Sequence, residues 1–279
     1  MITSDLHTHT NYSHGLDSVL DMYRAAIRHG LSFLGFSEHS LRPEGYAYPA
    51  EYRDNLRQGL PAYVQEVRAL QDLRGKNLDP GNLTALFGME VDWIGAEPEF
   101  VRQAATAYDF DYLIGSVHFL GRWGFDSSSG DWEQLDKVPR HTFYAAYFAA
   151  VADMAGSGLF QIAGHFDLIK IFSVRDFQAW LTGDNLDLVR DALAAVRDAG
   201  MAMEVSSAGL RKPCAEIYPG PAIMRLAADL QVPIAFASDA HAADQVAWAF
   251  PELATYAASF GYGSSLVFRG KDRIVLELE

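Results

Sequence analysis

The chain has 279 residues, 49% of them hydrophobic and 21% charged, and its 22 Lys and Arg against 36 Asp and Glu give a formal net charge of −14. This composition is typical of a folded globular chain and excludes a disordered or fibrous protein. The negative charge disfavours binding to nucleic acids and to anionic lipid headgroups. Because no apolar run is long enough to cross a bilayer and residues 1–10 are too polar for a signal peptide, we expect a cytoplasmic protein without a membrane partner.

Short apolar runs alternate along the chain with helix-length amphipathic segments. The runs predict strands at 2–6, 33–36, 84–89, 112–116, 162–164, 203–205 and 234–237, with a final pair at 266–268 and 274–278. The amphipathic segments predict helices at 18–29, 61–73, 98–107, 141–155, 186–199, 222–230 and 246–259. Gly30 and Gly200 stand where glycine commonly ends a helix.

We expect one domain over residues 1–279, because the sequence contains no linker-like stretch and no internal repeat. About seven strand–helix units in a chain of this length favour an α/β fold of the TIM-like (β/α)7 barrel type over a doubly wound sheet. Alternation of strands and helices alone separates these two architectures poorly. The single cysteine, Cys214, cannot form an internal disulfide.

The histidines fall at particular places in this pattern. Of the nine in the chain, only His29 and His141 belong to expected helices, and the others lie at or just beyond the ends of expected strands. Carboxylates accompany them, and the candidates in chain order are Asp5, His7, His9, His14, Glu38, His39, Glu90, His118, His165, Asp167, Asp239 and His241. Because the carboxyl ends of barrel strands share one mouth, these side chains are predicted to form one site there.

Imidazole and carboxylate ligands without thiolate favour divalent transition metals such as Zn, Mn or Fe. The candidate ligands are too many for one ion. One coordination sphere can be filled by His7, His9, Glu90 and Asp239, a second by Glu90 as a bridge with His118 and His165, and a third by His14, His39 and His241. Asp5, Glu38 and Asp167 are expected to accept hydrogen bonds from the ligating histidines, which usually donate their second ring N–H.

In this order, the motifs resemble those of the polymerase and histidinol phosphatase (PHP) superfamily of metal-dependent phosphoesterases, over nearly the whole chain. Three further segments resemble its histidinol-phosphate phosphatase branch: Gly115-Ser-Val-His118-Phe-Leu-Gly, Ala208-Gly-Leu-Arg211-Lys-Pro and Ile217-Tyr-Pro. The resemblance implies a distorted seven-stranded barrel, a trinuclear metal site divided as above, and hydrolysis of L-histidinol phosphate to L-histidinol and phosphate in histidine biosynthesis. The chain departs from the family pattern at Ser37-Glu38-His39, where Thr-Asp-His is common, and at Ser206-Ser207, where Asn-Thr is frequent.

Such a site suits hydrolysis of a phosphate ester, since a hydroxide shared between metal ions can attack phosphorus in line. Arg211 follows the expected strand 203–205 and can hold the phosphoryl group, with a solvated surface position as the alternative. Asp239 can collect the proton of the nucleophile. For the substrate's ammonium we expect a contact from an acidic residue such as Asp17, Asp126 or Glu216. For its imidazole we expect a contact from Trp123 or Tyr218, although Trp123 can equally anchor its loop.

Other functions stay open at this point. A PHP-type phosphoesterase acting on nucleotides or other small phosphate esters is the main alternative, and the net charge of −14 speaks against nucleic acid as its substrate. A barrel mouth with these ligands also suits metal-dependent hydrolysis of an amide or lactone. A noncatalytic metal-binding module explains Glu90 and Asp239 poorly, and the sequence gives no indication of the oligomeric state.

Overall fold

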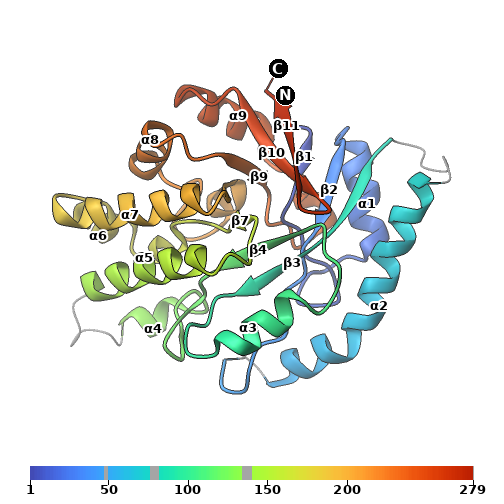
Figure 1. Ribbon diagram of the computed structural model, residues 1–279, viewed down its shortest axis with the longest axis horizontal. Helices are drawn as coiled ribbons and strands as arrows, with labels where there is room; N and C mark the ends of the chain where they lie inside the picture. The colour runs from blue at the N-terminus through green and yellow to red at the C-terminus, as the bar shows by residue number, and fades with distance from the viewer. Residues whose placement is uncertain (47–49, 76–81, 134–139, 279) are drawn as a thin grey trace.

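The computed structural model describes residues 1–46, 50–75, 82–133 and 140–278 (Figure 1). Its centre is a seven-stranded sheet in which neighbours in the chain are neighbours in space, in the order β1-β2-β3-β4-β7-β8-β9. The strands are β1 (Ser4–Asp5), β2 (Phe33–Phe36), β3 (Thr84–Asp92), β4 (Tyr112–Ser116), β7 (Ile162–Ala163), β8 (Ala202–Ser206) and β9 (Ile234–Ala237). Every pairing between them is parallel.

The first and last strands of this sheet meet, so that it nearly closes into a barrel. Beyond β1 and β9, Thr8 and Ala240 form a single parallel bridge. The Leu6 N–H donates to the Phe236 carbonyl at 3.1 Å, and the His9 N–H donates to the Ala240 carbonyl at 2.8 Å. Closure of this kind does not occur in an open doubly wound sheet. The structure therefore confirms the distorted (β/α)7 barrel.

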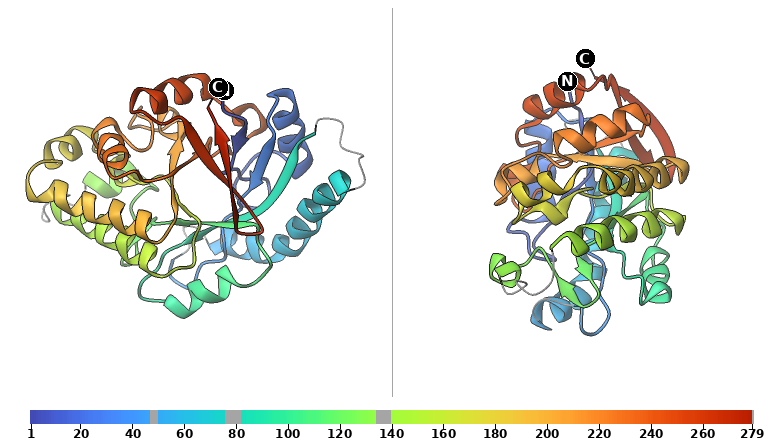
Figure 2. Two further views of the ribbon diagram at one scale, coloured as in Figure 1. Left: turned by 45° about the horizontal axis from the view of Figure 1, so that its top comes forward. Right: turned by 90° about the vertical axis from the view of Figure 1, so that its left-hand side faces the viewer.

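Helices surround the strands (Figures 1 and 2). The longer ones are α1 (Val19–Arg28), α2 (Ala50–Gly75), α3 (Pro98–Ala105), α5 (Arg140–Gly156), α6 (Val174–Trp180), α7 (Asp184–Asp198), α8 (Pro221–Asp229) and α9 (Phe250–Ser259). Shorter elements are the helix α4 (Ser129–Glu133) and the 3₁₀ turns η1 (Leu168–Lys170), η2 (Ser207–Arg211) and η3 (Ala243–Gln245). Within the described part of the chain, no helix combines the length and the apolarity that a bilayer crossing requires.

Helix α2 begins earlier in the chain than its local sequence predicts. A proline is common in the first turn of a helix, which is why Pro61 predicts a start there. The helix instead begins at Ala50 and runs through Pro61. Leu56, Tyr63 and Val67 are all buried, so one apolar face continues across the proline, whose own side chain is exposed. Tertiary packing of that face outweighs the missing backbone hydrogen bond.

Helix α9 starts later than the expected 246, at Phe250. The backbone before it is not helical, because Ala247 and Ala249 have φ angles of 55° and 56°. Such left-handed residues cannot continue a right-handed helix. The apolar period of 246–259 did not reveal this interruption. Elsewhere in the chain, the sequence pattern gave no sign of α4, of α6 or of the small hairpin β5 (Phe119–Leu120) and β6 (Trp123–Gly124).

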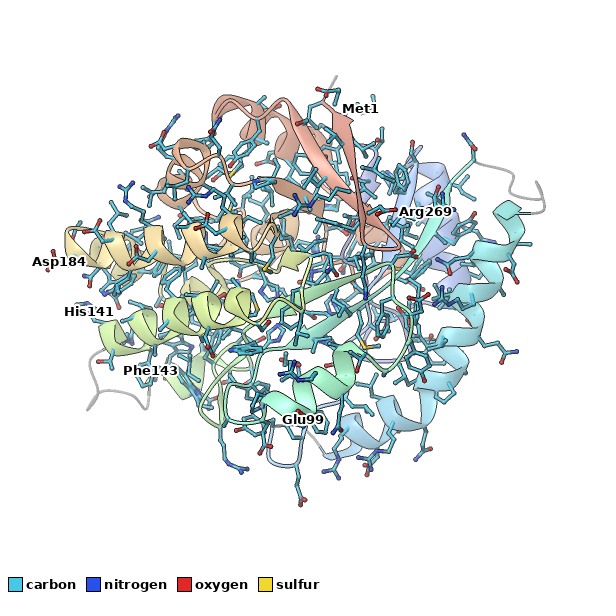
Figure 3. All side chains as sticks on the ribbon, in the orientation of Figure 1. Met1, Glu99, His141, Phe143, Asp184 and Arg269 are labelled. Atoms are coloured by element: carbon cyan, nitrogen blue, oxygen red, sulfur yellow. The ribbon has the colours of Figure 1, made fainter. Side chains whose placement is uncertain are left out.

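The two ends of the barrel differ. The antiparallel hairpin β10 (Ser264–Arg269) and β11 (Asp272–Glu277) lies over the end at which the parallel strands begin: the Lys271 N–H donates to the carbonyl of Asp111, the residue just before β4, at 2.8 Å. Val267 and Phe268 of this hairpin pack with the apolar side chains inside the barrel. Side chains fill the interior (Figure 3), and a larger core lies between the strands and the helices. The end of the barrel at which the strands begin is therefore closed by apolar packing. A polar site can form at the opposite end, where the strands finish.

Candidate metal centre

The predicted ligands meet at the carboxyl ends of the barrel strands. His7 and His9 follow β1, His39 follows β2, Glu90 lies near the end of β3, and the remaining ligands follow β4, β7 and β9. The side chains of His7, His9, His39, Glu90, His118, His165 and Asp239 are buried, His241 is half-buried and His14 is exposed. The structure thus brings together side chains that are spread through the sequence from His7 to His241.

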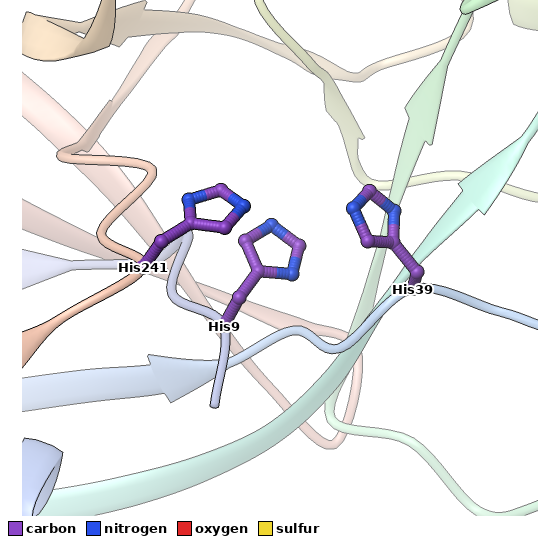
Figure 4. A group of neighbouring side chains, drawn as sticks. All are labelled: His9, His39 and His241. Atoms are coloured by element: carbon purple, nitrogen blue, oxygen red, sulfur yellow. The ribbon is translucent and has the colours of Figure 1, made fainter. Parts of the chain in front are cut away.

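Their ligand atoms form three groups, each with its atoms within 4.8 Å of one another: His7, His9 and Asp239; Glu90, His118 and His165; and His9, His39 and His241. Figure 4 shows the rings of the third group turned toward a common space. The His14 ring lies beside that group, with its centroid 4.3 Å from that of His241 and the two rings tilted relative to each other. These groups differ from the division expected from sequence in three respects: Glu90 belongs only to the second group, His14 belongs to none, and His9 belongs to two.

Glu90 lies at the centre of the three groups. Its Oε2 is 2.8 Å from His39 Nδ1 and 3.4 Å from His7 Nε2, and its Oε1 is 2.9 Å from His165 Nε2. A carboxylate with two oxygens can serve neighbouring ions at once, which is the bridging position that the sequence assigned to it.

The hydrogen bonding of the histidines fits a set of metal ligands. His7 Nδ1 is 2.6 Å from Glu204 Oε2, and His118 Nδ1 is 2.7 Å from Asp92 Oδ1. Neutral rings that donate from Nδ1 carry a lone pair on Nε2. These Nε2 atoms lie 3.1 Å from His9 Nε2 and 3.2 Å from His165 Nε2, respectively. Converging ring nitrogens of this kind suit a shared cation.

Three further buried ring nitrogens make no hydrogen bond to the described residues: Nδ1 of His9, Nδ1 of His165 and Nε2 of His241. Buried polar atoms are rarely left in this state unless an ion or water completes them. The donor set contains imidazole and carboxylate only. The residues present therefore fit divalent metal ions.

The charge states also suit metal binding. Burial alone would raise the pKa of Glu90, but His7, His39 and His118 outweigh it and hold this pKa well below its usual range. Burial lowers the pKa of His9 well below its usual range and also lowers the pKa of His39. Burial acts in the same direction on His7 and His118, but Glu204 and Glu90 outweigh it at His7, whose pKa is raised, and Glu90 and Asp92 outweigh it at His118, whose pKa is raised to about 9. The site therefore offers an ionised carboxylate and neutral rings at His9 and His39, while His7 and His118 would each release a proton on binding a metal.

Comparison with known proteins identifies the family. The model of the PHP domain family matches residues 5–208. The chain belongs to the PHP domain family. A relative from Deinococcus radiodurans named "probable histidinol-phosphatase" is 35% identical over 95% of this chain and 96% of its own length. The histidinol-phosphatase of Bacillus subtilis is 28% identical over 88% of this chain and 96% of its own length.

A solved structure has the same fold as this PHP chain. It is the histidinol phosphate phosphatase of Lactococcus lactis in complex with Zn, L-histidinol and phosphate, with a TM-score of 0.77 and 19% sequence identity. The alignment covers 98% of each chain.

The carboxylates that orient the PHP ligands are not those expected from sequence. Asp5 accepts hydrogen bonds from the Ser238 N–H at 2.9 Å and from the Ser238 hydroxyl at 2.6 Å. Glu38 accepts one from the Thr10 hydroxyl at 2.8 Å. Asp167 accepts one from the Gly220 N–H at 2.8 Å and pairs with Lys170.

Among the described residues, none of these three carboxylates receives a hydrogen bond from a histidine ring, so the predicted contacts were wrong. Asp5, Glu38 and Asp167 instead fasten the loops that carry the ligands. The orienting role belongs to Glu204 on β8 and Asp92 at the end of β3. A buried carboxylate inside an apolar run, as in Met203-Glu204-Val205, is the signal that could have indicated the first of them.

Arg211 lies beside the PHP centre in contact with a ligand loop. Its Nη2 donates to the carbonyls of Ser238 and Asp239 at 2.9 and 3.1 Å, and its guanidinium lies over the Trp248 ring at 5.3 Å. Burial lowers its pKa although Asp239 acts in the opposite direction. These contacts exclude the solvated surface position considered from sequence.

A cavity of about 250 Å³ opens over the ligands. Besides the metal-site histidines, Arg42, Asp126 and Lys212 bring charge to its wall. Arg42 is itself paired with Asp92, Nε to Oδ2 at 2.7 Å. The wall thus combines positive and negative groups around the PHP site.

Of the expected substrate contacts, Asp126 lines this cavity, whereas Asp17 and Trp123 are not among its lining residues. Asp17 accepts a hydrogen bond from the Ala243 N–H at 2.7 Å and so holds the turn η3. Trp123 packs edge-on against Trp132 and Phe143, with ring centroids 5.2 and 4.9 Å away. The structure therefore favours the loop-anchoring interpretation of Trp123 and gives Asp17 a structural contact.

Proposed function

We propose that this chain is a metal-dependent phosphomonoesterase that hydrolyses L-histidinol phosphate to L-histidinol and phosphate, a reaction of histidine biosynthesis. The observation that carries the proposal is the set of three adjoining ligand groups with Glu90 between them, at the open end of the barrel. It is supported by membership in the PHP domain family and by full-length relatives named for this activity.

We propose three divalent transition-metal ions, Zn, Fe or Mn, as the cofactors. The residues that would hold them are His7, His9, His14, His39, Glu90, His118, His165, Asp239 and His241. When bound, such ions supply positive charge for the phosphate oxygens and lower the pKa of water so that it can attack phosphorus. The chain's own part is to fix these ligands before the substrate arrives, through Glu204 on His7 and Asp92 on His118.

The protein residues also manage protons and charge. We assign to Asp239 the acceptance of a proton from the attacking water, because its carboxylate faces the cavity. We assign to Arg211 the positioning of the Asp239 loop, in place of the direct phosphoryl contact, because both of its Nη2 hydrogen bonds go to that loop.

Substrate contacts are proposed from the cavity wall. Lys212 suits a phosphate oxygen, and Asp126 suits the ammonium group or the imidazole of the substrate. Binding of that remote half helps to position the phosphate over the ligands, so esters that lack it should lose kcat as well as affinity. Small anionic esters remain the alternative substrates, and the net charge of −14 disfavours nucleic acid.

We also propose that residues 1–279 form one domain and act in the cytoplasm. The family match ends at residue 208, yet Asp239 and His241 lie beyond it and β9 closes the barrel onto β1. The site therefore requires the carboxyl-terminal part of the chain. The cytoplasmic location follows from the proposed biosynthetic role.

The test is phosphate release by metal-reconstituted protein from a panel of substrates. The panel contains L-histidinol phosphate, p-nitrophenyl phosphate, nucleoside monophosphates and sugar phosphates, compared by kcat/KM under one metal condition. Histidinol phosphate should be hydrolysed far better than the others. If a nucleotide or sugar phosphate is preferred by about tenfold or more, the histidinol assignment is wrong. Hydrolysis of amides or lactones without phosphatase activity would favour the other enzyme class.

A further inference from the structure

The hairpin β10–β11 leaves one edge of a strand without a neighbour. The hairpin lies at the periphery of the molecule, outside the barrel strands (Figure 2). Strand β11 pairs with β10 in a two-stranded sheet, and no other strand of the described residues pairs with β11. An open edge of this kind is a template for pairing with another chain.

The register of the hairpin fixes which backbone groups face that edge. The Leu278 N–H donates to the Gly263 carbonyl at 2.8 Å, so the backbone of residue 278 points toward β10. Direction alternates along an antiparallel strand. The N–H and C=O groups of Arg273, Val275 and Glu277 therefore point outward. The two-residue turn, with φ angles of 56° at Gly270 and 70° at Lys271, gives the same alternation.

We propose that a second copy of this chain pairs antiparallel with β11 about a two-fold axis at Val275. In this register Val275 lies opposite the partner's Val275, and Arg273 lies opposite the partner's Glu277. Because of the two-fold symmetry, Glu277 also lies opposite the partner's Arg273. All three outward residues of each copy then form backbone hydrogen bonds, and the two hairpins become one four-stranded sheet.

The charges of β11 select this arrangement. An antiparallel pair centred on Val275 sets arginine against glutamate at both ends, whereas a parallel pair in register sets like charges against each other. A shift of the centre by one residue in either direction places Val275 opposite Arg273 or Glu277. Edge strands are commonly protected by charges that repel a second copy, but the charges of β11 attract one.

Apolar side chains support the same register. Val275 is 58% exposed and lies opposite Leu266 of β10. Pairing at Val275 creates a continuous row from Leu266 through Val275 to the same two residues of the partner. The row borders a cavity of about 330 Å³ whose wall includes Val232 and Tyr262. Burying this exposed valine gives the pair an apolar centre between two charged contacts.

The test is the oligomeric state in solution, measured by light scattering after size exclusion and by sedimentation at tens of micromolar protein. We expect a dimer for the unmodified chain. Glu277→Lys should raise the dimer dissociation constant roughly tenfold or more, because both charge pairs become repulsive. The double variant Arg273→Glu with Glu277→Lys should restore the dimer. Glu99→Lys, the same charge change on exposed α3 far from the hairpin (Figure 3), should leave it intact.

A backbone variant tests the strand pairing itself. Val275→Pro removes only an outward N–H, so the bonds to β10 are kept while a partner strand is blocked. It should be monomeric with the helix and strand content of the unmodified chain. Monomeric unmodified protein overturns the proposal. A dimer that withstands both Glu277→Lys and Val275→Pro also overturns it, since that dimer uses another face.

Discussion

Glu204 joins two ligand-bearing segments through its two oxygens. Its Oε2 accepts a hydrogen bond from His7 Nδ1 at 2.6 Å, and its Oε1 accepts one from the His165 N–H at 3.2 Å. The side chain is 1% exposed, so water cannot replace either contact. A glutamine at this position keeps the shape but has one acceptor oxygen for two donors. In Glu204→Gln, one buried N–H must therefore face the amide nitrogen.

The cost of this mismatch can be estimated. A buried donor without an acceptor costs about 1–3 kcal/mol, which should appear as reduced stability of the metal-free protein. If His7 is the group that loses its partner, its ring is no longer oriented, and changes of this kind typically weaken metal binding or activity by roughly 10- to 100-fold. We therefore expect Glu204→Gln to bind metal more weakly even at temperatures well below the one at which the variant unfolds.

Competition with a chelator measures the affinity, and urea unfolding of the metal-free protein measures the stability. Glu66→Gln is the matched control, because Glu66 is exposed and accepts a hydrogen bond only from the Tyr12 hydroxyl among its described contacts. The control should change neither quantity appreciably. Metal affinity and activity at the unmodified level in Glu204→Gln would refute the role assigned to this carboxylate.

Three further predictions concern the ions and the loop of Asp239. Elemental analysis of gently purified protein should find more than one transition-metal ion per chain, and a ratio of one or less in active protein contradicts the three-ion model. His118→Ala should lose one ion and most phosphatase activity together, because the Glu90 group then lacks a ligand; a fully active variant contradicts the assignment. Arg211→Ala should lower kcat/KM by about 2–4 kcal/mol in equivalent free energy and should also lower the melting temperature, since two hydrogen bonds to the ligand loop are lost. Arg211→Lys should recover part of the rate, and unchanged kinetics in both would remove Arg211 from the site.

The strands were the most predictable part of the fold. The expected ranges of β2, β4 and β9 coincide with the observed ones, because each is a short apolar run bounded by polar or turn-forming residues. Helix starts were less predictable. At α2 the buried face overrides the local proline signal, and at α9 the left-handed residues Ala247 and Ala249 have no signature in an alanine-rich sequence.

The ligands were predictable because their chemistry is visible at the ends of strands. Their hydrogen-bond partners were not, since these depend on which side chains of different strands face each other inside the barrel. Asp92 follows Glu90 by two residues and therefore shares its side of β3, but its contact with His118 requires the register of β3 against β4. Sequence spacing within one strand carries no information about that register.

The burial of carboxylates connects the site to the stability of the fold. Glu90, Asp92, Glu204 and Asp239 are each at most 9% exposed and lie within one end of the barrel. Burying a carboxylate is costly unless positive charge and hydrogen bonds compensate it. Of these four carboxylates, Arg42 pairs with Asp92. In the metal-free protein His7 and His118 supply part of this positive charge, because neighbouring carboxylates outweigh the effect of burial and raise the pKa of each ring. Metal ions supply it when they bind in place of those protons, so their binding energy contributes to folding.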